Sequence, residues 1–468
     1  MKESGADCTL KETIHIYHTN DLHSHFERWP RIRDFLLKRK SFHKEQGEAC
    51  YLFDIGDHID RSHPYTDATR GKGNVLMLNE IGYDAVTIGN NEGITLSPGE
   101  LADLYEEAEF PVVLDNLFNE EGKRPAWTVP EAYLTTRSGI RIGLIAATAD
   151  FSTSYERLGW QVTGPRSALE AAAPRVSGQS DILVCLSHMG SSEDERLAQY
   201  TGGKIDVILG GHTHHLYPDG REVGGTLIAA AGKWGQYVGE VTLTFDHNEG
   251  RIVEATAEVH DTETLPIPGD DTDYDRQLRK RAAELLSSTV FLNPSELRGS
   301  WDGPTPLSDL FAEALIAHTG ADCAMFNSGI FLGGLPEGPV SGMDLHRLLP
   351  HPINPCVITL TGAELEEAYE LSLNPEWPDV RLKGLGFRGE QVGAMIHQEM
   401  VRGKDGKLIV AGSAVEPGRM YRLATLDLFT YGFFFPAFKQ ARKEYFMPEL
   451  IRDVLAGYAI RKYGTPSS

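Results

Sequence analysis

Long apolar runs are missing from this 468-residue sequence, and none approaches the roughly 18 residues that a membrane-spanning helix needs. The opening stretch MKESGADCTLKETIHIYH has no apolar core segment, so we expect no secretory signal there. The five cysteines are odd in number, lack Cys-x-x-Cys spacing and are scattered at Cys8, Cys50, Cys185, Cys323 and Cys356. Such a pattern is typical of reduced thiols, and we therefore expect a cytoplasmic protein.

Positive charge is also in short supply. The 44 Lys and Arg residues are outnumbered by 67 Asp and Glu residues, which gives a formal net charge of −23. This balance opposes non-specific binding to nucleic acid or anionic membranes, and no basic stripe favours a nuclease. It remains compatible with a small anionic ligand that metal ions hold, so the expected partner is a small molecule.

Short β-branched apolar segments alternate with helical patterns in the first half of the chain. CYLFDIGD, RIGLIAAT and DILVCLSH are of the first kind, and RIRDFLLKRKSFHKE is of the second. This alternation predicts an α/β domain over about 10–262. The stretch TETLPIPGDDTD and the amphipathic segment DYDRQLRKRAAELLSS predict a linker and connecting helix over 263–290. Residues 291–468 mix helical and strand-like segments and are expected to form a second domain.

Metal-ligand residue types follow five of the predicted strands in the first domain. Because ligands in open α/β sheets bind beyond the carboxyl ends of the strands, we expect these side chains to converge on one crevice. Asp-x-His and His-x-His pairs place two side chains on the same side of a strand, which suits the binding of one ion. The predicted ligands are Asp21, His23, Asp57, Asn90, His188, His212 and His214.

Two carboxylates, one amide and four imidazoles suit Mn²⁺, Zn²⁺, Fe or Co. Two such ions about 3.5–4 Å apart can share a bridging carboxylate and a bridging hydroxide, and such a hydroxide can attack phosphorus in line. Each motif alone is weak evidence, since Gly-Asp is usually a turn and an isolated His is usually structural. Their order along the chain, each at the end of a predicted strand, is a strong joint signal.

These five blocks resemble those of the calcineurin-like metallophosphoesterases. The segments LRGSWDGPTPLSDLFAEALIAHTG and LPHPINPCVITLTGAELEEAYE are similar to the C-terminal domain of bacterial 5′-nucleotidases and 2′,3′-cyclic phosphodiesterases. The resemblance implies a four-layer α/β/β/α catalytic domain, a connecting helix and a smaller α+β substrate-binding domain. It assigns one divalent ion to Asp21, His23, Asp57 and His214, and a second to Asp57, Asn90, His188 and His212, with Asp57 bridging.

Three positions depart from the family pattern. Asn91 stands where the family's Gly-Asn-His-Glu block has its His, which stabilises the transition state and helps to protonate the leaving oxygen. In NSGIF, which begins at Asn327, Phe331 stands where a phosphate-binding Arg is expected. In YGFFF, Phe434 replaces an Asp. Asp57 and Asn91 are therefore the predicted catalytic residues.

The substrate contacts expected from the resemblance are Asn91, Asn327 and two base-stacking rings: Phe387 in GLGFRG on one face, and Phe429 or the Phe433–Phe435 run on the other. Aromatic rings that flank a groove suit stacking on a purine or pyrimidine. Packing of these rings in the core is an equally good interpretation.

The first functional hypothesis is a two-metal phosphohydrolase that acts on nucleotide-like phosphate esters, cyclic diesters or anhydrides. An amide at position 91 donates hydrogen bonds but gives up no proton, which favours bonds whose leaving group needs none. His25, His58, His63 and His215 are alternative proton donors beside the ligand motifs. The second hypothesis is a metal-retaining binding or regulatory protein with slow turnover.

Overall fold

The computed structural model describes residues 10–464, and these form two compact units. Unit 1 comprises the chain up to Asp60 together with Thr69–Leu278. Unit 2 comprises Arg61–Ala68 and the chain from Arg279 onward. The second division lies inside helix α9 (Tyr274–Leu285), within the segment predicted to connect two domains.

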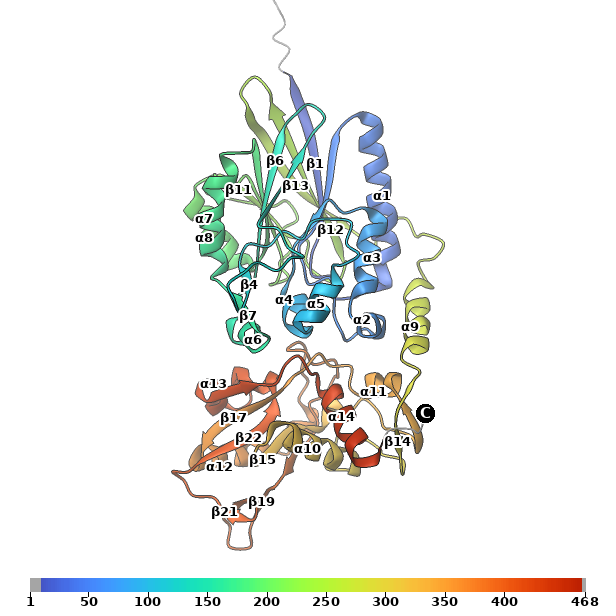
Figure 1. Cartoon of the computed structure of the whole chain (residues 1–468), viewed down its shortest axis with the longest axis vertical. Coiled ribbons are helices and arrows are strands. Elements are labelled where there is room, and N and C mark those ends of the chain that lie inside the picture. Colours follow the sequence, from blue (N-terminus) through green and yellow to red (C-terminus); the bar gives the residue numbers. More distant parts are fainter. Residues whose placement is uncertain (1–9, 465–468) are drawn as a thin grey trace, which may run out of the picture. The chain divides into compact units, whose positions relative to one another are not determined.

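Unit 1 contains two mixed β-sheets (Figure 1). The first has the order β13 (Arg251–Asp261), β12 (Tyr237–Asp246), β1 (Lys11–Thr19), β2 (Ala49–Asp54) and β3 (Ala85–Val86). The second has the order β10 (Arg221–Val223), β11 (Thr226–Ala229), β9 (Val207–Gly210), β8 (Ile182–His188), β6 (Arg141–Thr148) and β5 (Glu131–Thr135). Strands β1, β2 and β3 run parallel in the first sheet, as do β6, β8, β9 and β11 in the second.

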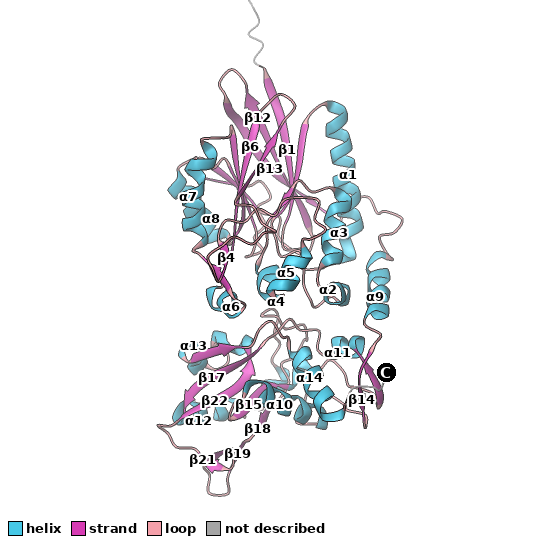
Figure 2. Cartoon of the chain, in the orientation of Figure 1, coloured by secondary structure: helices cyan, strands magenta, loops and turns pink. Residues whose placement is uncertain are grey.

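The main core of unit 1 lies between the two sheets. Alternate residues such as Ile14 and Ile16 of β1 pack with Leu144 of β6 and with Val184 and Leu186 of β8. Helices α1 (Trp29–Gln46) and α3 (Lys72–Ile81) lie beside the first sheet, whereas α7 (Pro165–Ser177) and α8 (Ser191–Thr201) cover the second (Figures 1 and 2). These four layers confirm the predicted α/β/β/α arrangement.

Two local features of unit 1 differ from the sequence-based expectation. The hairpin of β12 and β13 extends the first sheet, although the sequence analysis named no strands there. β13 is an edge strand with many exposed residues, so its sequence carries little apolar alternation. The apolar, β-branched segment PVVLDN (111–116) has the composition of a strand but forms only isolated bridges, Val86 with Val112 and Val113 with Val129.

The shorter elements of unit 1 connect the layers. They are η1 (Phe26–Arg28), α4 (Asn90–Thr95), α5 (Pro98–Leu104), α6 (Ser152–Arg157), β4 (Leu117–Asn119) and β7 (Trp160–Val162). Helix α2 (Pro64–Thr69) follows the loop after β2.

Unit 2 is built on a five-stranded sheet with the order β18 (Met395–Gln398), β15 (Cys323–Asn327), β22 (Met420–Leu426), β17 (Pro355–Thr361) and β23 (Arg442–Tyr445). Helices α10 (Pro306–Thr319), α12 (Gly362–Ser372) and α14 (Ile451–Tyr463) contribute to one large apolar core with this sheet. The Thr305 side chain accepts a hydrogen bond from the Ser308 N–H at the start of α10, and Gly320 ends that helix in a left-handed conformation. The α+β prediction for this domain is confirmed.

The remaining elements of unit 2 are short. They are β14 (Thr289–Asn293), β16 (Gly338–Ser341), α11 (Gly342–Leu348), β19 (Met400–Arg402), β20 (Leu408–Val410), β21 (Ser413–Ala414), α13 (Pro436–Gln440), η2 (Ser328–Ile330), η3 (Trp377–Asp379) and η4 (Asp427–Tyr431). Among the helices of the described residues, none has both the length and the apolar character to cross a membrane.

Candidate metal centre

Unit 1 brings the predicted ligands together where its central strands end. Asp21 and His23 follow β1, Asp57 follows β2, and Asn90 begins α4 after β3. His188 is the last residue of β8, while His212 and His214 follow β9. Because β1–β3 and β8–β9 are parallel sets, their carboxyl ends deliver these side chains to one edge of the two sheets.

The donor atoms form two adjoining groups. Those of Asp21, His23 and His214 lie within 4.8 Å of one another, and so do those of Asp57, His188 and His212. Asp57 Oδ2 is 3.4 Å from His188 Nε2 and 3.7 Å from His23 Nε2, so this carboxylate adjoins both groups. Asp21 Oδ1 is 3.4 Å from His214 Nε2. Their role as metal ligands stays a prediction.

Two buried acceptor atoms at this site make no hydrogen bond within the described residues. They are His188 Nε2 and Asn90 Oδ1. The other ring nitrogen of His188, Nδ1, is 2.7 Å from the Ile55 carbonyl oxygen and donates its proton there. Nε2 is therefore the nitrogen that faces Asp57 Oδ2, at 3.4 Å, and it offers a free electron pair to a cation only when His188 is neutral. Since a buried acceptor without a partner is costly, this chemistry fits a bound cation.

The buried carboxylates of the site also favour a bound positive charge. The carboxylates of Asp21 and Asp57 are almost completely buried. Burial raises the pKa of Asp57, but His188 and His23 outweigh burial and hold that pKa well below its usual range. Burial lowers the pKa of His188, yet attraction to Asp57 and Asp21 raises it to about 10. Two buried carboxylates that raise the pKa of a neighbouring imidazole in this way favour a bound cation.

The backbone at the site has an uncommon conformation. Five of the seven predicted ligands have positive φ although none is glycine: Asp21, His23, Asp57, His212 and His214. Positive φ is uncommon outside glycine and clusters at functional sites. Gly89 allows the closest approach, because a Cβ atom there would lie 2.0 Å from Asp57 Oδ1. The loops are thus shaped around the ligand side chains.

A buried carboxylate that the sequence analysis did not single out fixes these loops. Glu92 Oε2 accepts hydrogen bonds from the N–H groups of Asp57 (3.0 Å) and Gly89 (2.8 Å). Its Oε1 accepts another from the Ile59 N–H at 3.0 Å. Glu92 therefore ties the loop that carries Asp57 to the start of α4. Its position in the Gly-Asn-Asn-Glu block was the only sequence signal for this role.

Asn91, the residue that departs from the family pattern, contacts a predicted ligand directly. Its Nδ2 is 2.9 Å from His23 Nδ1 and also donates to the Ile59 carbonyl oxygen at 3.0 Å. Its backbone N–H donates to Asp57 Oδ1 at 2.7 Å. Asn91 thus supports two ligands, and its function as a proton-donor substitute or a substrate contact stays a prediction.

The predicted substrate residues of unit 2 are buried. Asn327 has no exposed surface and donates to the Val392 carbonyl oxygen at 2.8 Å. Phe387 is 3% exposed and stacks on His351 with ring centroids 5.2 Å apart, whereas Phe429 has no exposed surface. A base has no free ring face to stack on at Phe429, so its burial agrees with the core interpretation.

The two substitutions in unit 2 are also apolar packing residues. Phe331 is 2% exposed and packs edge-to-face on Phe311. Phe434 is partly buried and its ring centroid lies 5.4 Å from that of Trp377. Both positions thus carry apolar side chains in packing contacts, where the family pattern has a charged group.

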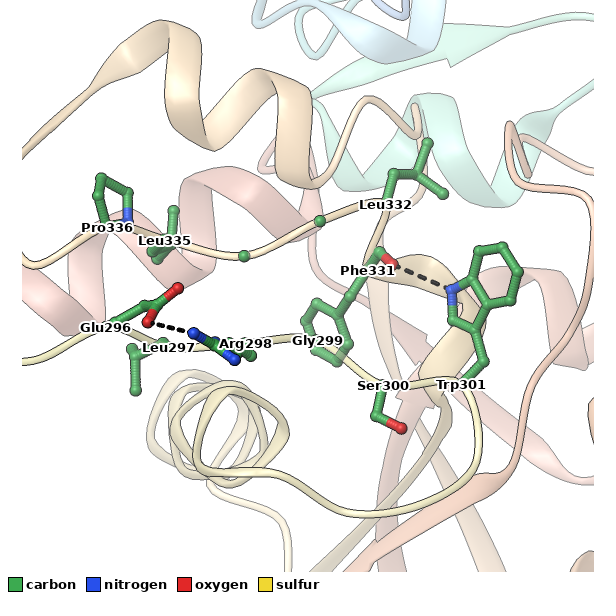
Figure 3. Close-up of a pocket in the computed structure, with 12 residues that line it drawn as sticks. Glu296, Leu297, Arg298, Gly299, Ser300, Trp301, Phe331, Leu332, Leu335 and Pro336 are labelled. Carbon is green, nitrogen blue, oxygen red and sulfur yellow. Dashed lines mark hydrogen bonds and ion pairs between the residues drawn. The ribbon is translucent and has the colours of Figure 1, made fainter.

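Unit 2 has a cavity of about 630 Å³ between residues 296–301 and 331–336 (Figure 3). The Trp301 indole is 42% exposed, and its Nε1–H donates to the Phe331 carbonyl oxygen at 3.2 Å. Glu296 and Arg298 form an exposed ion pair at the other end of the cavity (Figure 3). Trp301 is an accessible aromatic residue that the sequence analysis did not consider.

Two family models match this chain. Residues 14–216 match calcineurin-like phosphoesterases, and residues 285–440 match the 5′-nucleotidase C-terminal domain. The uncharacterized metallophosphoesterase YunD of Bacillus subtilis (strain 168) is 42% identical over 458 residues, which cover 96% of this chain and 99% of that protein. A 5′-nucleotidase of Vibrio cholerae serotype O1 is 24% identical and covers 77% of this chain and 75% of its own.

Solved structures with the same fold are more distant in sequence. A putative 5′-nucleotidase from Staphylococcus aureus superposes with a TM-score of 0.66 at 18% identity, over 97% of each chain. The Haemophilus influenzae NAD nucleotidase NadN has a TM-score of 0.62 at 15% identity, over 97% of this chain and 96% of its own. At such identities the likeness concerns the fold.

Proposed function

Because this chain belongs to the calcineurin-like metallophosphoesterases that carry a 5′-nucleotidase C-terminal domain, as its motifs predicted, we propose that it hydrolyses nucleotide-like phosphoanhydrides or diesters at a dinuclear metal centre. Enzymes of this family are phosphoesterases that use two divalent metal ions. The observation that carries the proposal is the position of Asp57, whose Oδ2 adjoins a nitrogen donor of each group.

The seven predicted ligands divide between two ions. Asp21, His23, Asp57 and His214 would hold the first, and Asp57, Asn90, His188 and His212 the second. The mixture of oxygen and imidazole donors suits Mn²⁺, Zn²⁺, Fe or Co. When bound, such ions activate water and neutralise the charge that develops on the phosphoryl oxygens.

The residues around the ligands position them and limit the choice of leaving group. Glu92 accepts three backbone hydrogen bonds, two from the Asp57 loop and one from Gly89, and the Ile55 carbonyl orients His188. Asn91 can donate a hydrogen bond to a substrate oxygen but cannot transfer a proton. Phosphoanhydrides and strained cyclic diesters release groups that need less protonation than a ribose hydroxyl, so we propose these bonds over simple nucleoside monoesters.

A metal-retaining regulatory protein with slow turnover is the second candidate. Two observations favour it. Phe387 and Phe429, the predicted base contacts, are buried, and Phe331 stands where the family pattern has a phosphate-binding Arg. The intact set of seven ligands favours the enzyme, because a binding module requires no carboxylate shared between two metal groups.

A substrate panel distinguishes the two candidates. The full-length protein, supplied with Mn²⁺, is incubated with nucleoside monophosphates, cyclic nucleotides, dinucleotides and nucleoside-diphosphate sugars, and product release is measured. The proposal predicts faster turnover of anhydrides and cyclic diesters than of AMP. Release of no product from any compound by a protein that contains its metals would support the regulatory candidate.

We also propose a cytoplasmic location. Its support is that Cys50, Cys185, Cys323 and Cys356, the cysteines of the described residues, form no disulfide, whereas Cys8 lies outside those residues. Fractionation of cells that express the chain from its own gene tests this proposal.

A further inference from the structure

A cavity of about 450 Å³ opens beside His212, one of the predicted metal ligands. All of its lining residues belong to unit 1. Three segments form its walls: residues 149–151 after β6, residues 164–167 at the start of α7, and Met189 with Glu193 after β8. Its volume lies within the range of small-molecule sites. A substrate whose phosphorus lies at the metal centre can therefore extend into this cavity past His212.

One side of the cavity is apolar and aromatic. The Phe151 ring packs edge-to-face on the His212 ring, with centroids 5.7 Å apart and planes at 87°. Phe151 is only partly buried, and Pro165 and Met189 complete this side. An aromatic ring fixed next to a reacting centre offers a stacking surface for a planar group.

The other side is polar and carries more negative than positive charge. Arg166 forms ion pairs with Glu170 (Nε to Oε1, 3.2 Å) and Glu193 (Nη1 to Oε2, 3.7 Å). Asp150 accepts a hydrogen bond from the Ser152 N–H at 3.1 Å and, as a carboxylate, can accept others. Two lining carboxylates and one guanidinium disfavour a second phosphate group and favour a ring that bears amino groups.

We infer that this cavity binds the heterocyclic base of a nucleoside phosphate, with Phe151 and Asp150 as specificity-determining residues. The inference rests on the proposed function, since it supplies the base contact that unit 2 lacks at Phe387 and Phe429. Phe151 stacks on the base, and Asp150 accepts hydrogen bonds from its amino group. Bases that carry an exocyclic amine, such as adenine, bind more tightly than uracil.

Binding of adenosine to the full-length protein with Mn²⁺, measured by titration calorimetry, tests this inference without requiring turnover. Loss of a stacking ring is expected to weaken adenosine binding about tenfold or more in Phe151→Ala. Tyr200→Ala, which removes an exposed ring from α8 of the same unit, is the control and is expected to bind as the parent does. Phe151→Leu keeps an apolar side chain and is expected to weaken binding as well, and its unfolding temperature reports whether the fold is intact.

Two further measurements can overturn the inference. Asp150→Asn is expected to reduce the preference for adenosine over uridine, and an unchanged preference would contradict the role of Asp150. If Trp301→Ala weakens adenosine binding while Phe151→Ala does not, the base binds in the unit 2 cavity of Figure 3 instead. If adenosine fails to bind but the substrate panel is hydrolysed, this inference is wrong and the proposed function stands.

Discussion

The amide nitrogen of Asn91 lies 2.9 Å from Nδ1 of His23, a predicted metal ligand. Because the same nitrogen donates to the Ile59 carbonyl oxygen at 3.0 Å, the amide presents N–H to His23. His23 Nδ1 then accepts, and a neutral His23 carries its proton on Nε2, the nitrogen nearest to Asp57 and Asp21. His188 has the opposite arrangement, with its proton on Nδ1. Binding of a cation at His23 Nε2 therefore requires that nitrogen to lose its proton, and the Nδ1–H that results needs an acceptor where Asn91 Nδ2 now lies.

Asn91→Asp is expected to tighten metal binding. A carboxylate at position 91 accepts a hydrogen bond from His23 Nδ1–H, which leaves the Nε2 electron pair free, and changes of this kind in the contacts of metal ligands alter affinity about 10–100-fold. The measurement is competition for metal with a chelator of known affinity. Asn79→Asp is the control, because Asn79 also bridges backbone groups in unit 1 but lies away from the ligands. Weaker metal binding in Asn91→Asp than in the parent would contradict this account of the amide.

Turnover is expected to depend steeply on the acidity of the leaving group, because the Asn91 amide has no proton to transfer. A series of aryl phosphates of graded leaving-group pKa measures this dependence. Asn91→His is expected to flatten it by speeding the poor leaving groups, with a gain below the ~10²–10⁴ of a well-placed acid. A flat dependence in the parent would show that another residue, such as His58 or His63, donates the proton.

Glu92→Gln is expected to destabilise unit 1 and lower its metal content together. The glutamine NH₂ group would face backbone N–H groups that now donate to the carboxylate, and each lost buried bond costs roughly 1–3 kcal/mol. Urea unfolding and metal analysis measure the two effects. Glu364→Gln is the matched control, since Glu364 only caps α12 by accepting the Thr361 N–H at 2.8 Å, and its loss costs about 1 kcal/mol. Equal effects of the two substitutions would be evidence against the role of Glu92.

Asp67 is buried between two arginines of unit 2. Its Oδ1 is 2.8 Å from Arg452 Nη2 and 2.8 Å from Arg61 Nε. Burial raises the pKa of Asp67, but the two guanidinium groups outweigh burial and hold the pKa well below its usual range. His346 and Asp453 also face this cluster.

Asp67→Asn is expected to cost roughly 3–5 kcal/mol at neutral pH, as breaking a buried ion pair does. A lowered native pKa adds stability in full above the unfolded value near 3.9, and this stability is lost as pH falls through the native value. The difference in urea midpoint between parent and variant should therefore be constant from about pH 5 to 8 and shrink in acid. Glu313→Gln, which breaks a half-exposed pair with Lys462, is the control and should cost about 0–1 kcal/mol. A difference that grows in acid would refute this assignment.

Local sequence signals predicted that the seven candidate ligands would lie together, because each lies within a few residues of the strand that positions it. The apolar segment that ends in His188 and the Gly56-Asp57 pair after β2 could be recognised without information from the rest of the chain. The contacts of Glu92 and Asn91 could not be predicted, since their partners at Asp57, Ile59 and His23 lie 32 or more residues away.

The sequence could not decide whether the predicted substrate residues of unit 2 line a groove or fill a core. Phe429 and Phe387 have the same composition signal whether they line a groove or fill a core, and only packing against distant residues such as His351 decides between them. The β12–β13 hairpin could not be predicted for a similar reason: β13 has weak apolar alternation, and the hairpin is held in the sheet by the pairing of β12 with the distant strand β1.

The most direct test of the dinuclear assignment is metal analysis of the purified full-length protein alongside Asp57→Asn, with turnover of the best panel substrate measured on the same samples. The account predicts two divalent ions per chain in the parent. It predicts that Asp57→Asn loses metal and activity together, because a buried carboxylate that adjoins both donor groups has lost its charge. Full metal occupancy and parental turnover in Asp57→Asn would contradict it.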